Sequence, residues 1–331
     1  MDSVSVFGAG SWGTAIAYLL GGKGVPTRLW GRDAARMAQI ERDRGNAAYL
    51  PEVRLPAEVR ATAELAEAAE HGAVWVLAVP SFAMRALAEA LAPHVGPGTL
   101  AVNLAKGLEA GSLKTMSQLL GEALPGAAAF TLSGPSHAEE VGRDFPTSVV
   151  IAGPDLERGK RLQGLFMTER FRPYLSPDVL GVEYGGTVKN VIALAAGALD
   201  GLGFGDNAKG ALISRGLAEM VRLCVRLGTQ RETLFGLSGL GDLVTTCTSK
   251  HSRNRFVGEQ IGRGKTLDQV RAEMNMVAEG VFATRTVREL ARAHGVEMPI
   301  TEACYDVLYE DAPPLQKLSE LMTREPKVET L

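Results

Sequence analysis

The stretch VFGAGSWGTA, residues 6–15, lies almost at the start of the chain and decides how the first half folds. It carries three glycines in the order G-x-G-x-x-G, namely Gly8, Gly10 and Gly13. An apolar run, Val4–Phe7, precedes the glycines, and a helix-compatible run, Thr14–Leu20, follows them. Glycines at these places let the backbone turn sharply, bring main-chain N–H groups against a pyrophosphate and let helix and strand pack closely. The stretch therefore predicts a dinucleotide-binding loop, although glycines so spaced also occur in turns that bind nothing.

The sequence after this loop alternates strand-forming and helix-forming segments up to about residue 150. The strand-forming runs are Val4–Phe7, Thr27–Trp30, Val74–Val79, Leu100–Leu104, Phe130–Leu132 and Ser148–Ile151. Between them lie segments rich in Ala, Glu and Arg, such as Arg60–Ala69 and Met84–Leu91, whose composition favours helix. This alternation is typical of a parallel sheet covered on both faces, so we predict a Rossmann-like, doubly wound α/β domain.

Past Gly181 the strand signal disappears and segments with helical spacing take over. These segments are Val188–Leu199, Leu212–Leu227, Leu267–Met274, Val281–His294 and Glu302–Glu310. The joint is expected within residues 173–181. We therefore divide the 331 residues into a dinucleotide-binding domain, residues 1–180, and an all-α substrate-binding and catalytic domain, residues 181–331.

Composition excludes several classes of protein. The formal net charge of -3 provides no basic surface for nucleic acid. The three cysteines, Cys224, Cys247 and Cys304, are far apart and form no C-x-x-C pair, which favours a reducing compartment. The five histidines show no metal-ligand spacing, and no apolar stretch is long enough to span a membrane. We expect a cytoplasmic protein without a metal site.

The end of the second strand indicates which nicotinamide cofactor is used. An acidic residue about 20 residues after the glycine loop usually binds the ribose 2′-hydroxyl of NAD. Here Arg32 holds the best position, with Asp33 one residue beyond. A guanidinium suits a 2′-phosphate, so we expect NADP(H), with NAD(H) also accepted. The alternative is that Arg32 only begins a solvated helix.

A lysine in an apolar helix is the first candidate for acid–base chemistry. Lys189 and Asn190 lie in a segment, 188–199, whose apolar residues point in nearly every direction, so the helix is expected to be buried. A buried ammonium is costly unless it is paired or its pKa falls. Lys189 could then donate a proton to a carbonyl oxygen, or else be a lysine that reaches solvent at a domain interface.

Two more candidate pieces follow predicted strands, where ligands collect in a doubly wound sheet. Lys106, in NLAKGLE, is expected to face the nicotinamide and the substrate. In LSGPSH, Gly134 and Ser136 lie in a turn able to present backbone N–H groups. His137 is interpreted as a hydrogen-bonded structural group rather than a catalyst.

The segment GLSGLGDLVTTCTSKHSRNRFVG supplies a carboxylate and an anion site. Asp242 lies among glycines that permit close approach to other segments. Ser252 is predicted to cap a helix that begins with Arg253 and Asn254, and such a helix start suits a phosphate. A basic surface turn is the alternative.

Taken together, these motifs resemble the soluble NAD(P)-dependent sn-glycerol-3-phosphate dehydrogenase family in its bacterial form. The resemblance covers nearly the whole chain and rests on GAGSWGTA, NLAKGLE, LSGPSHAEEV, EYGGTVKNVIALAAGALDGLGFGDNAKGALISRGLAEM, GLSGLGDLVTTCTSKHSRNRFVG and VAEGV. It implies NAD(P)H-dependent reduction of dihydroxyacetone phosphate to sn-glycerol 3-phosphate, the backbone precursor of phospholipids. It also implies a homodimer.

The resemblance assigns roles residue by residue. It implies Lys189 as general acid/base, Lys106 as a second active-site lysine and Asp242 as the group that orients Lys189. The substrate positions that it implies are Lys106, Gly134, Ser136, Lys189, Asp242, Ser252, Arg253 and Asn254. The cofactor positions, with those of the glycine loop, are Gly8, Gly10, Ser11, Trp12, Gly13, Arg32, Lys106, Ala138, Arg253, Val277 and Glu279.

Two other functions fit the same architecture. A β-hydroxyacid dehydrogenase also carries a lysine on the first helix of its helical domain, but its substrates are carboxylates. A non-catalytic dinucleotide sensor would be expected to have lost Lys106 or Lys189, and the chain keeps both.

Overall fold

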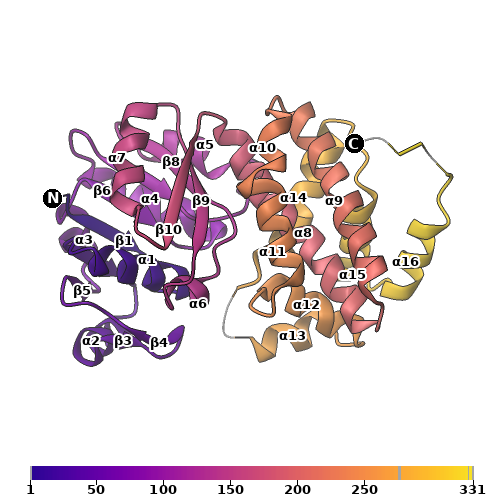
Figure 1. Ribbon diagram of the computed structural model, residues 1–331, viewed down its shortest axis with the longest axis horizontal. Coiled ribbons are helices and arrows are strands. Elements are labelled where there is room, and N and C mark those ends of the chain that lie inside the picture. Colours follow the sequence, from indigo (N-terminus) through magenta and orange to yellow (C-terminus); the bar gives the residue numbers. More distant parts are fainter. Residues whose placement is uncertain (1, 275–276, 327, 330–331) are drawn as a thin grey trace. The chain divides into compact units, whose positions relative to one another are not determined.

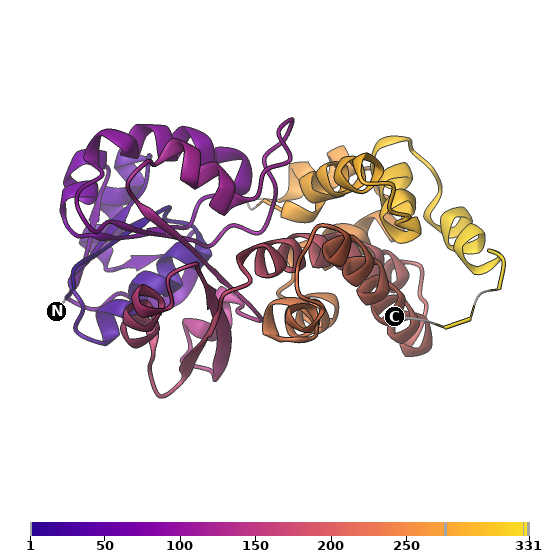
Figure 2. The same ribbon diagram turned by 90° about the horizontal axis from the view of Figure 1, so that it is seen from above.

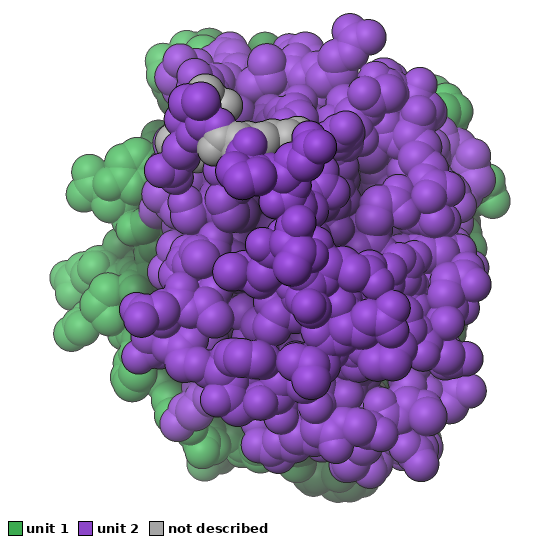
Figure 3. All heavy atoms as spheres, turned by 90° about the vertical axis from the view of Figure 1, so that its right-hand side faces the viewer, with its two compact units in different colours: residues 1–105, 114–179 green, residues 106–113, 180–331 purple. Residues whose placement is uncertain are grey.

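The structure is a computed structural model that describes residues 2–274, 277–326 and 328–329. The chain divides into two compact units, which Figure 3 shows in separate colours. The first unit comprises Met1–Ala105 and Lys114–Val179, and the second comprises Lys106–Leu113 and Leu180–Leu331. The predicted domain limits, 1–180 and 181–331, remain a prediction, and they differ from these units in the placement of residues 106–113.

Within the described residues, the first unit is built on an eight-stranded sheet of order β10-β9-β8-β7-β6-β1-β2-β5 (Figure 1). The strands are β1 (Val4–Phe7), β2 (Thr27–Trp30), β5 (Val59–Thr62), β6 (Val74–Leu77), β7 (Leu100–Asn103), β8 (Ala128–Ser133), β9 (Thr147–Ala152) and β10 (Phe171–Ser176). A separate hairpin is formed by β3 (Gly45–Asn46) and β4 (Leu50–Arg54). Neighbouring strands of the large sheet are parallel except β8 and β9, which are antiparallel.

Side chains that alternate along the strands pack into two hydrophobic cores, one on each face of the sheet. Val4 and Val6 belong to a core that includes residues of α1 (Ser11–Gly22) and α7 (Leu156–Phe166). Phe7 and its neighbour Trp75 belong to another core. The second core is completed by α3 (Leu65–Glu70), α4 (Met84–Leu91) and α5 (Met116–Ala123). The remaining helices of this unit are α2 (Ala34–Asp43) and α6 (Ala138–Val141).

The doubly wound fold is therefore confirmed, and two details of the prediction are wrong. The sheet is not wholly parallel, because β9 and β10 run opposite to the other strands. The helix expected over Arg60–Ala69 begins only at Leu65, since β5 pairs with β2 and buries Val59 and Thr62. The joint expected within residues 173–181 remains a prediction, and its first residues belong to β10, an edge strand in which Pro173 is tolerated although it lacks an N–H group.

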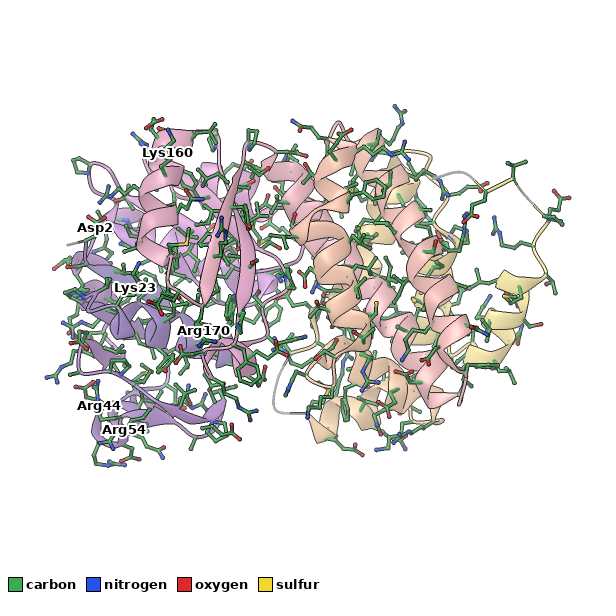
Figure 4. All side chains as sticks on the ribbon, viewed as in Figure 1. Asp2, Lys23, Arg44, Arg54, Lys160 and Arg170 are labelled. Carbon is green, nitrogen blue, oxygen red and sulfur yellow. The ribbon has the colours of Figure 1, made fainter. Side chains whose placement is uncertain are left out.

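Lys23 ties the end of α1 to the end of α7 within the first unit. Its Nζ donates to the carbonyl oxygens of Gly164 at 2.8 Å and Leu165 at 2.7 Å, and Figure 4 labels this side chain. Burial lowers the pKa of the Lys23 ammonium. A cation at the last carbonyls of α7 satisfies groups that the helix itself leaves unpaired.

The second unit is helical in its described residues, as predicted. Its helices are α8 (Val179–Gly201), α9 (Asp206–Arg226), α10 (Arg231–Phe235), α11 (Asp242–Thr248), α12 (Arg253–Gly262), α13 (Leu267–Glu273), α14 (Glu279–Ala293), α15 (Pro299–Tyr309) and α16 (Pro314–Met322). A π-helical turn, η3 (Leu237–Gly241), immediately precedes α11. Figure 2 shows α16 at the edge of this unit, and α16 buries no side chain fully. No helix among the described residues is both long and apolar enough to cross a membrane.

Glycines let α8 and α12 approach at backbone distance. Gly197 and Gly201 lie one turn apart on α8, and Gly258 and Gly262 lie one turn apart on α12. A Cβ at Gly197 would lie 1.9 Å from the carbonyl oxygen of Arg255, and a Cβ at Gly258 would lie 1.9 Å from that of Leu194. The start of α12 is thereby fixed against α8.

Candidate active site

Lys189 is the centre of a buried polar cluster in the helical unit. It lies on α8 and is 5% exposed. Its Nζ donates to Asp242 Oδ1 at 2.9 Å and to Thr246 Oγ1 at 2.7 Å. The ammonium has three N–H bonds, and the third has no hydrogen-bond partner among the described residues. Lys189 is thus held by two bonds and keeps one proton for a ligand.

The second lysine binds the other oxygen of the same carboxylate. Lys106 Nζ donates to Asp242 Oδ2 at 2.7 Å, and Asp242 is 2% exposed. The segment 106–113 belongs to the helical unit because Leu108 is buried in the core of that unit. In addition, Asn190 Nδ2 donates to the carbonyl oxygen of Lys106 at 3.2 Å. The structure therefore brings together Lys106, Lys189 and Asp242, the three residues predicted as catalytic.

Burial and the oppositely charged partner shift the pKa values of Lys189 and Asp242 in opposite directions. Burial lowers the pKa of Lys189 to about 8, and Lys106 adds to the lowering while Asp242 opposes it. Burial alone would raise the pKa of the Asp242 carboxyl, but the two lysines outweigh burial and hold it below its usual value. Asp242 therefore stays ionised near neutral pH, while Lys189 is able both to give and to take a proton.

Thr246 completes the cluster and was not among the residues predicted from the sequence. Its hydroxyl accepts from Lys189 and donates to the backbone carbonyl oxygen of Asp242 at 2.6 Å, one turn earlier on α11. Because Thr246 and Asp242 are four residues apart, a helix beginning at Asp242 places both on one face. That spacing is the sequence signal that could have identified Thr246.

A chain of amide hydrogen bonds connects the lysine cluster with the starts of two helices. Asn254 Nδ2 donates to Asn190 Oδ1 at 2.8 Å, and the Gly280 N–H donates to Asn254 Oδ1 at 2.9 Å. Asn254 is 8% exposed. Its side chain therefore holds α12 and α14 against α8. This structural role was not predicted, since Asn254 was expected only to contact the substrate. Asn190 also lay outside the predicted site.

The start of α12 has the geometry predicted for it. The Ser252 hydroxyl accepts from the Arg255 N–H at 3.1 Å, so Ser252 caps the helix. Arg253 is exposed and has no hydrogen bond or ion pair among the described residues. Arg255 instead makes ion pairs with Asp200 at 2.5 Å and with Glu259 at 3.3 Å. In the run S-R-N-R, Arg253 is therefore a solvated cation, Asn254 is a buried amide, and Arg255 is held in ion pairs within the helical unit.

Val277 and Glu279, predicted to contact the cofactor, flank the start of α14. Val277 is half-buried just before the helix, and Glu279 is its first residue. Gly280 approaches the amide chain so closely that a Cβ there would lie 2.6 Å from the carbonyl oxygen of Asn190. The predicted cofactor positions at this end thus adjoin the residues that connect to the lysine cluster.

In the first unit, the glycine loop has the shape of a phosphate cradle. Gly8 has a φ of +120°, and a Cβ there would lie 2.6 Å from the carbonyl oxygen of Ala78. A Cβ at Gly13 would lie 1.9 Å from the Gly8 carbonyl oxygen. Gly10 is the N-cap of α1, leaves open space where a Cβ would be and provides no side chain to cap the helix. This N-terminus fits the pyrophosphate of a dinucleotide.

Neighbouring side chains fix the glycine loop without closing it. Ser11 donates to the carbonyl oxygen of Tyr49 at 2.9 Å, and Asn46 donates to that of Ala9 at 2.9 Å. Trp12, predicted to contact the cofactor, is half-buried and packs against the sheet core. The loop is thus held in place by contacts on the side of the β3–β4 hairpin.

The residues after β2 leave one arginine exposed for a ligand. Asp33 caps α2 by accepting from the Arg36 N–H at 3.0 Å, so its carboxylate serves the helix. Arg32 is exposed, with no hydrogen bond or ion pair in the part of the chain that the structure describes. This arrangement fits recognition of a 2′-phosphate better than that of a bare ribose hydroxyl.

The turn after β8 also belongs to the first unit. Gly134 has a φ of +139°, and the Ser136 hydroxyl donates to its carbonyl oxygen at 2.9 Å. His137 occupies the N-cap position of α6, and Ala138 is the first residue of that helix. Gly134, Ser136 and Ala138 are therefore grouped in one turn, and their predicted contacts with substrate and cofactor remain predictions.

Two family models together match most of the chain. Residues 3–158 match the family model described as NAD-dependent glycerol-3-phosphate dehydrogenase N-terminus, and residues 178–319 match that for the C-terminus. The chain belongs to this family. Glycerol-3-phosphate dehydrogenase [NAD(P)+] of Chlorobium limicola is 51% identical, with 98% of this chain and 99% of the relative covered. An enzyme of the same name from Salinibacter ruber is also 51% identical, with 99% and 97% covered.

A solved structure of the family shares the fold over almost the whole length. The crystal structure of glycerol-3-phosphate dehydrogenase from Coxiella burnetii is 37% identical and matches with a TM-score of 0.95. The match covers 98% of this chain and 99% of that chain. Membership of the glycerol-3-phosphate dehydrogenase family sets aside the β-hydroxyacid dehydrogenase interpretation.

Proposed function

We propose that this enzyme reduces dihydroxyacetone phosphate to sn-glycerol 3-phosphate with NADPH or NADH, reversibly, and so supplies the backbone of phospholipids. The observation that carries the proposal is the buried ammonium of Lys189, whose Nζ is fixed by Asp242 and Thr246 and retains one N–H bond. Family membership supports the same reaction. A non-catalytic sensor is disfavoured because Lys106 and Lys189 both bind the carboxylate of Asp242 and so form one cluster.

Lys189 is proposed as the general acid. A ketone becomes an alkoxide when hydride adds to its carbon, and the third N–H of Lys189 would donate the proton that this oxygen requires. Asp242 holds the ammonium charged before transfer, and Lys106 would polarise the same region by its own charge. In the reverse direction, neutral Lys189 would take the proton from the C2 hydroxyl.

The phosphate of the substrate is assigned to the start of α12. The exposed cation of Arg253 and the N-terminal N–H groups of a capped helix favour an anion. Ser252 and Asn254 fix this end of the helix through its cap and the amide chain. Binding energy from the phosphate would be used to align the carbonyl with Lys189.

The cofactor is assigned to the glycine loop, with Gly8, Gly10 and Gly13 forming the cradle and Arg32 taking the 2′-phosphate of NADP(H). When bound, the reduced nicotinamide supplies the hydride. Ser11, Trp12, Ala138, Val277 and Glu279 are further proposed cofactor contacts, carried by the family resemblance. Gly134 and Ser136 are proposed substrate contacts on the same basis.

We also propose a cytoplasmic homodimer. The three cysteines are free and buried, which supports a reducing compartment. The helical unit exposes large apolar side chains, among them Phe204 at 41% and Val225 at 44%, which supports association through that unit. The mass of the purified protein by light scattering tests the dimer, and a monomer at micromolar concentration would contradict it.

The reaction is tested by the oxidation of NADPH and NADH with purified enzyme and either dihydroxyacetone phosphate or dihydroxyacetone. We expect turnover with the phosphorylated ketone and little with the other. Arg253→Ala should reduce this discrimination roughly 10- to 100-fold, because a charge-assisted contact is lost. Arg215→Ala, which removes another exposed arginine of the helical unit, is the matched control. Equal turnover of both ketones by the native enzyme would place the phosphate requirement in doubt.

A further inference from the structure

Gly185 marks a close contact between α8 and the π-helical turn η3. A Cβ at Gly185 would lie 3.0 Å from the carbonyl oxygen of Ser238 and 3.4 Å from Leu234 Cδ2. The Cα of Gly239 would be 3.6 Å from the same Cβ. All these neighbours belong to α10 or η3, so the backbone of the turn packs directly on the face of α8 that carries Gly185.

The same face of α8 carries the proposed acid. Lys189 follows Gly185 by four residues, one turn along α8, and Asp242 follows Ser238 by four residues, about one turn along the opposing segment. The Lys189–Asp242 hydrogen bond of 2.9 Å thus lies one turn beyond the Gly185–Ser238 contact. Any displacement of η3 from α8 is expected to lengthen the bond that holds Lys189.

The π-helical turn itself has a specific cause. Gly239 lies so close to the preceding helix that a Cβ there would be 2.0 Å from the carbonyl oxygen of Leu234. The Gly241 N–H donates to the Gly236 carbonyl oxygen at 3.1 Å, which closes an i+5 bond just before Asp242. Such turns are rare and concentrate at functional sites.

We propose that Gly185, together with η3, is a positioning element that sets the separation between Lys189 Nζ and the carboxylate of Asp242. The inference rests on the proposed role of Lys189. Glycine is required at 185 because any side chain would push η3, and with it Asp242, away from α8. Gly185 touches neither substrate nor cofactor in this account and acts only through Asp242.

Gly185→Ala tests the inference, because the neighbour must give by only a few tenths of an ångström. Gly210→Ala is the matched control, since a Cβ at this exposed site of α9 meets nothing within 4 Å. Lengthening the Lys189 Nζ–Asp242 Oδ1 distance weakens the attraction that keeps Lys189 charged. For an increase of ~0.4 Å at an effective dielectric constant of about 20, the pKa of Lys189 should fall by about half a unit. Gly185→Ser should give an equal or larger shift.

Two readouts separate positioning from chemistry. The pKa of Lys189 is measured directly by NMR of ¹³Cε-labelled lysine, with Lys189→Met to assign the resonance, and the alkaline limb of kcat for ketone reduction is measured in parallel. We expect both to move to lower pH in Gly185→Ala, with the KM for NADPH unchanged and Gly210→Ala like the native enzyme.

The possible results have distinct meanings. An unchanged Lys189 pKa in a folded Gly185→Ala and Gly185→Ser would overturn the positioning role, as would a loss of stability alone. A lowered pKa with an unmoved kcat limb would uphold the positioning role while removing Lys189 from the proposed mechanism.

Discussion

At the scale of single residues, the environment of Lys189 decides what the site can do. A lysine in water is protonated far above neutral pH, whereas burial here lowers the pKa of Lys189 to about 8. Desolvation is the largest influence, and the carboxylate of Asp242 partly restores the charged form. The result is an acid strong enough to release its proton and still charged when the substrate binds.

The first prediction concerns pH. Ketone reduction needs protonated Lys189, so kcat should be flat below about pH 7 and fall as pH rises through about 8. Alcohol oxidation needs the neutral lysine, so its kcat should rise over the same interval. Steady-state rates in both directions from pH 6 to 10 check this. Limbs of the same sign in the two directions would be incompatible with a single acid–base group.

Part of this cluster could be predicted from the sequence. Lys189 stands out because a charged residue interrupts an apolar helix, and Asp242 because it lies among glycines. Thr246 does not stand out in this way, and Asn190, which interrupts the same apolar helix as Lys189, was given no role in the predicted site. Their importance depends on which helices meet, and hydroxyl and amide side chains are common at both buried and exposed positions.

At the scale of elements, the close packing of α8 and α12 determines where the start of α12 lies. Two glycines on each helix allow contact between the backbones. This arrangement was not predicted, because glycines within helical segments are equally consistent with exposed or irregular positions.

The second prediction tests this packing. Gly197→Ala should lower the free energy of unfolding by roughly 1–3 kcal/mol, since the new methyl group would overlap the Arg255 carbonyl. Gly210→Ala should instead stabilise the protein by about 0.5–1 kcal/mol, as expected for alanine in an exposed helix. Urea denaturation measures both. Equal effects of the two substitutions would mean that α8 and α12 separate without cost.

The third prediction concerns a buried carboxyl outside the candidate site. Glu219 of α9 accepts from the Ile300 N–H at 2.6 Å at the start of α15, and burial raises its pKa to about 7. The folded protein therefore binds a proton that the unfolded chain releases between about pH 4.5 and 7. Its contribution to stability is complete below pH 4.5 and is lost as pH rises through about 7.

Glu219→Gln isolates this contribution. The free energy of unfolding of the native protein should fall relative to that of the variant as pH rises from 5 to 8. Denaturation at several pH values measures the difference. A constant difference would show that Glu219 has the same pKa in the folded and unfolded states.

The boundaries of elements show where local sequence is sufficient. β1 and β2 have the predicted limits, because apolar strand-forming residues there are bounded by turns. β5 was missed, since its sequence VRAT precedes a helix-forming segment and only pairing with β2 makes it a strand. The reversed direction of β9 is likewise a property of the sheet that no local pattern encodes.

At the scale of the whole molecule, the candidate functions are divided between the units. The glycine loop and Arg32 lie in the first unit, and Lys106, Lys189, Asp242 and Arg253 lie in the second. Segment 106–113 is flanked in sequence by residues of the first unit, but it belongs to the second unit because Leu108 is buried in the helical core. The α/β fold of the first half and the helical fold of the second were predictable from strand and helix periodicity. The assignment of segment 106–113 to the helical unit was not.

The fourth prediction follows from the division. Arg32→Ala should raise the KM for NADPH roughly 10- to 150-fold, since a charge-assisted contact to the 2′-phosphate is lost. The KM values for NADH and for dihydroxyacetone phosphate should change little. Steady-state titration of each cofactor checks this, with Arg54→Ala, another exposed arginine of the first unit, as the control. Equal losses with both cofactors would remove Arg32 from 2′-phosphate recognition.

The role of Lys189 as general acid is tested by the turnover of Lys189→Ala, measured alongside the affinity of this variant for NADPH. We expect a loss of about 10²- to 10⁴-fold in kcat for dihydroxyacetone phosphate reduction, with NADPH binding near that of the native enzyme. Added primary amines should partly restore the rate. Native turnover in a folded Lys189→Ala that still binds NADPH would contradict the assignment of Lys189 as the general acid.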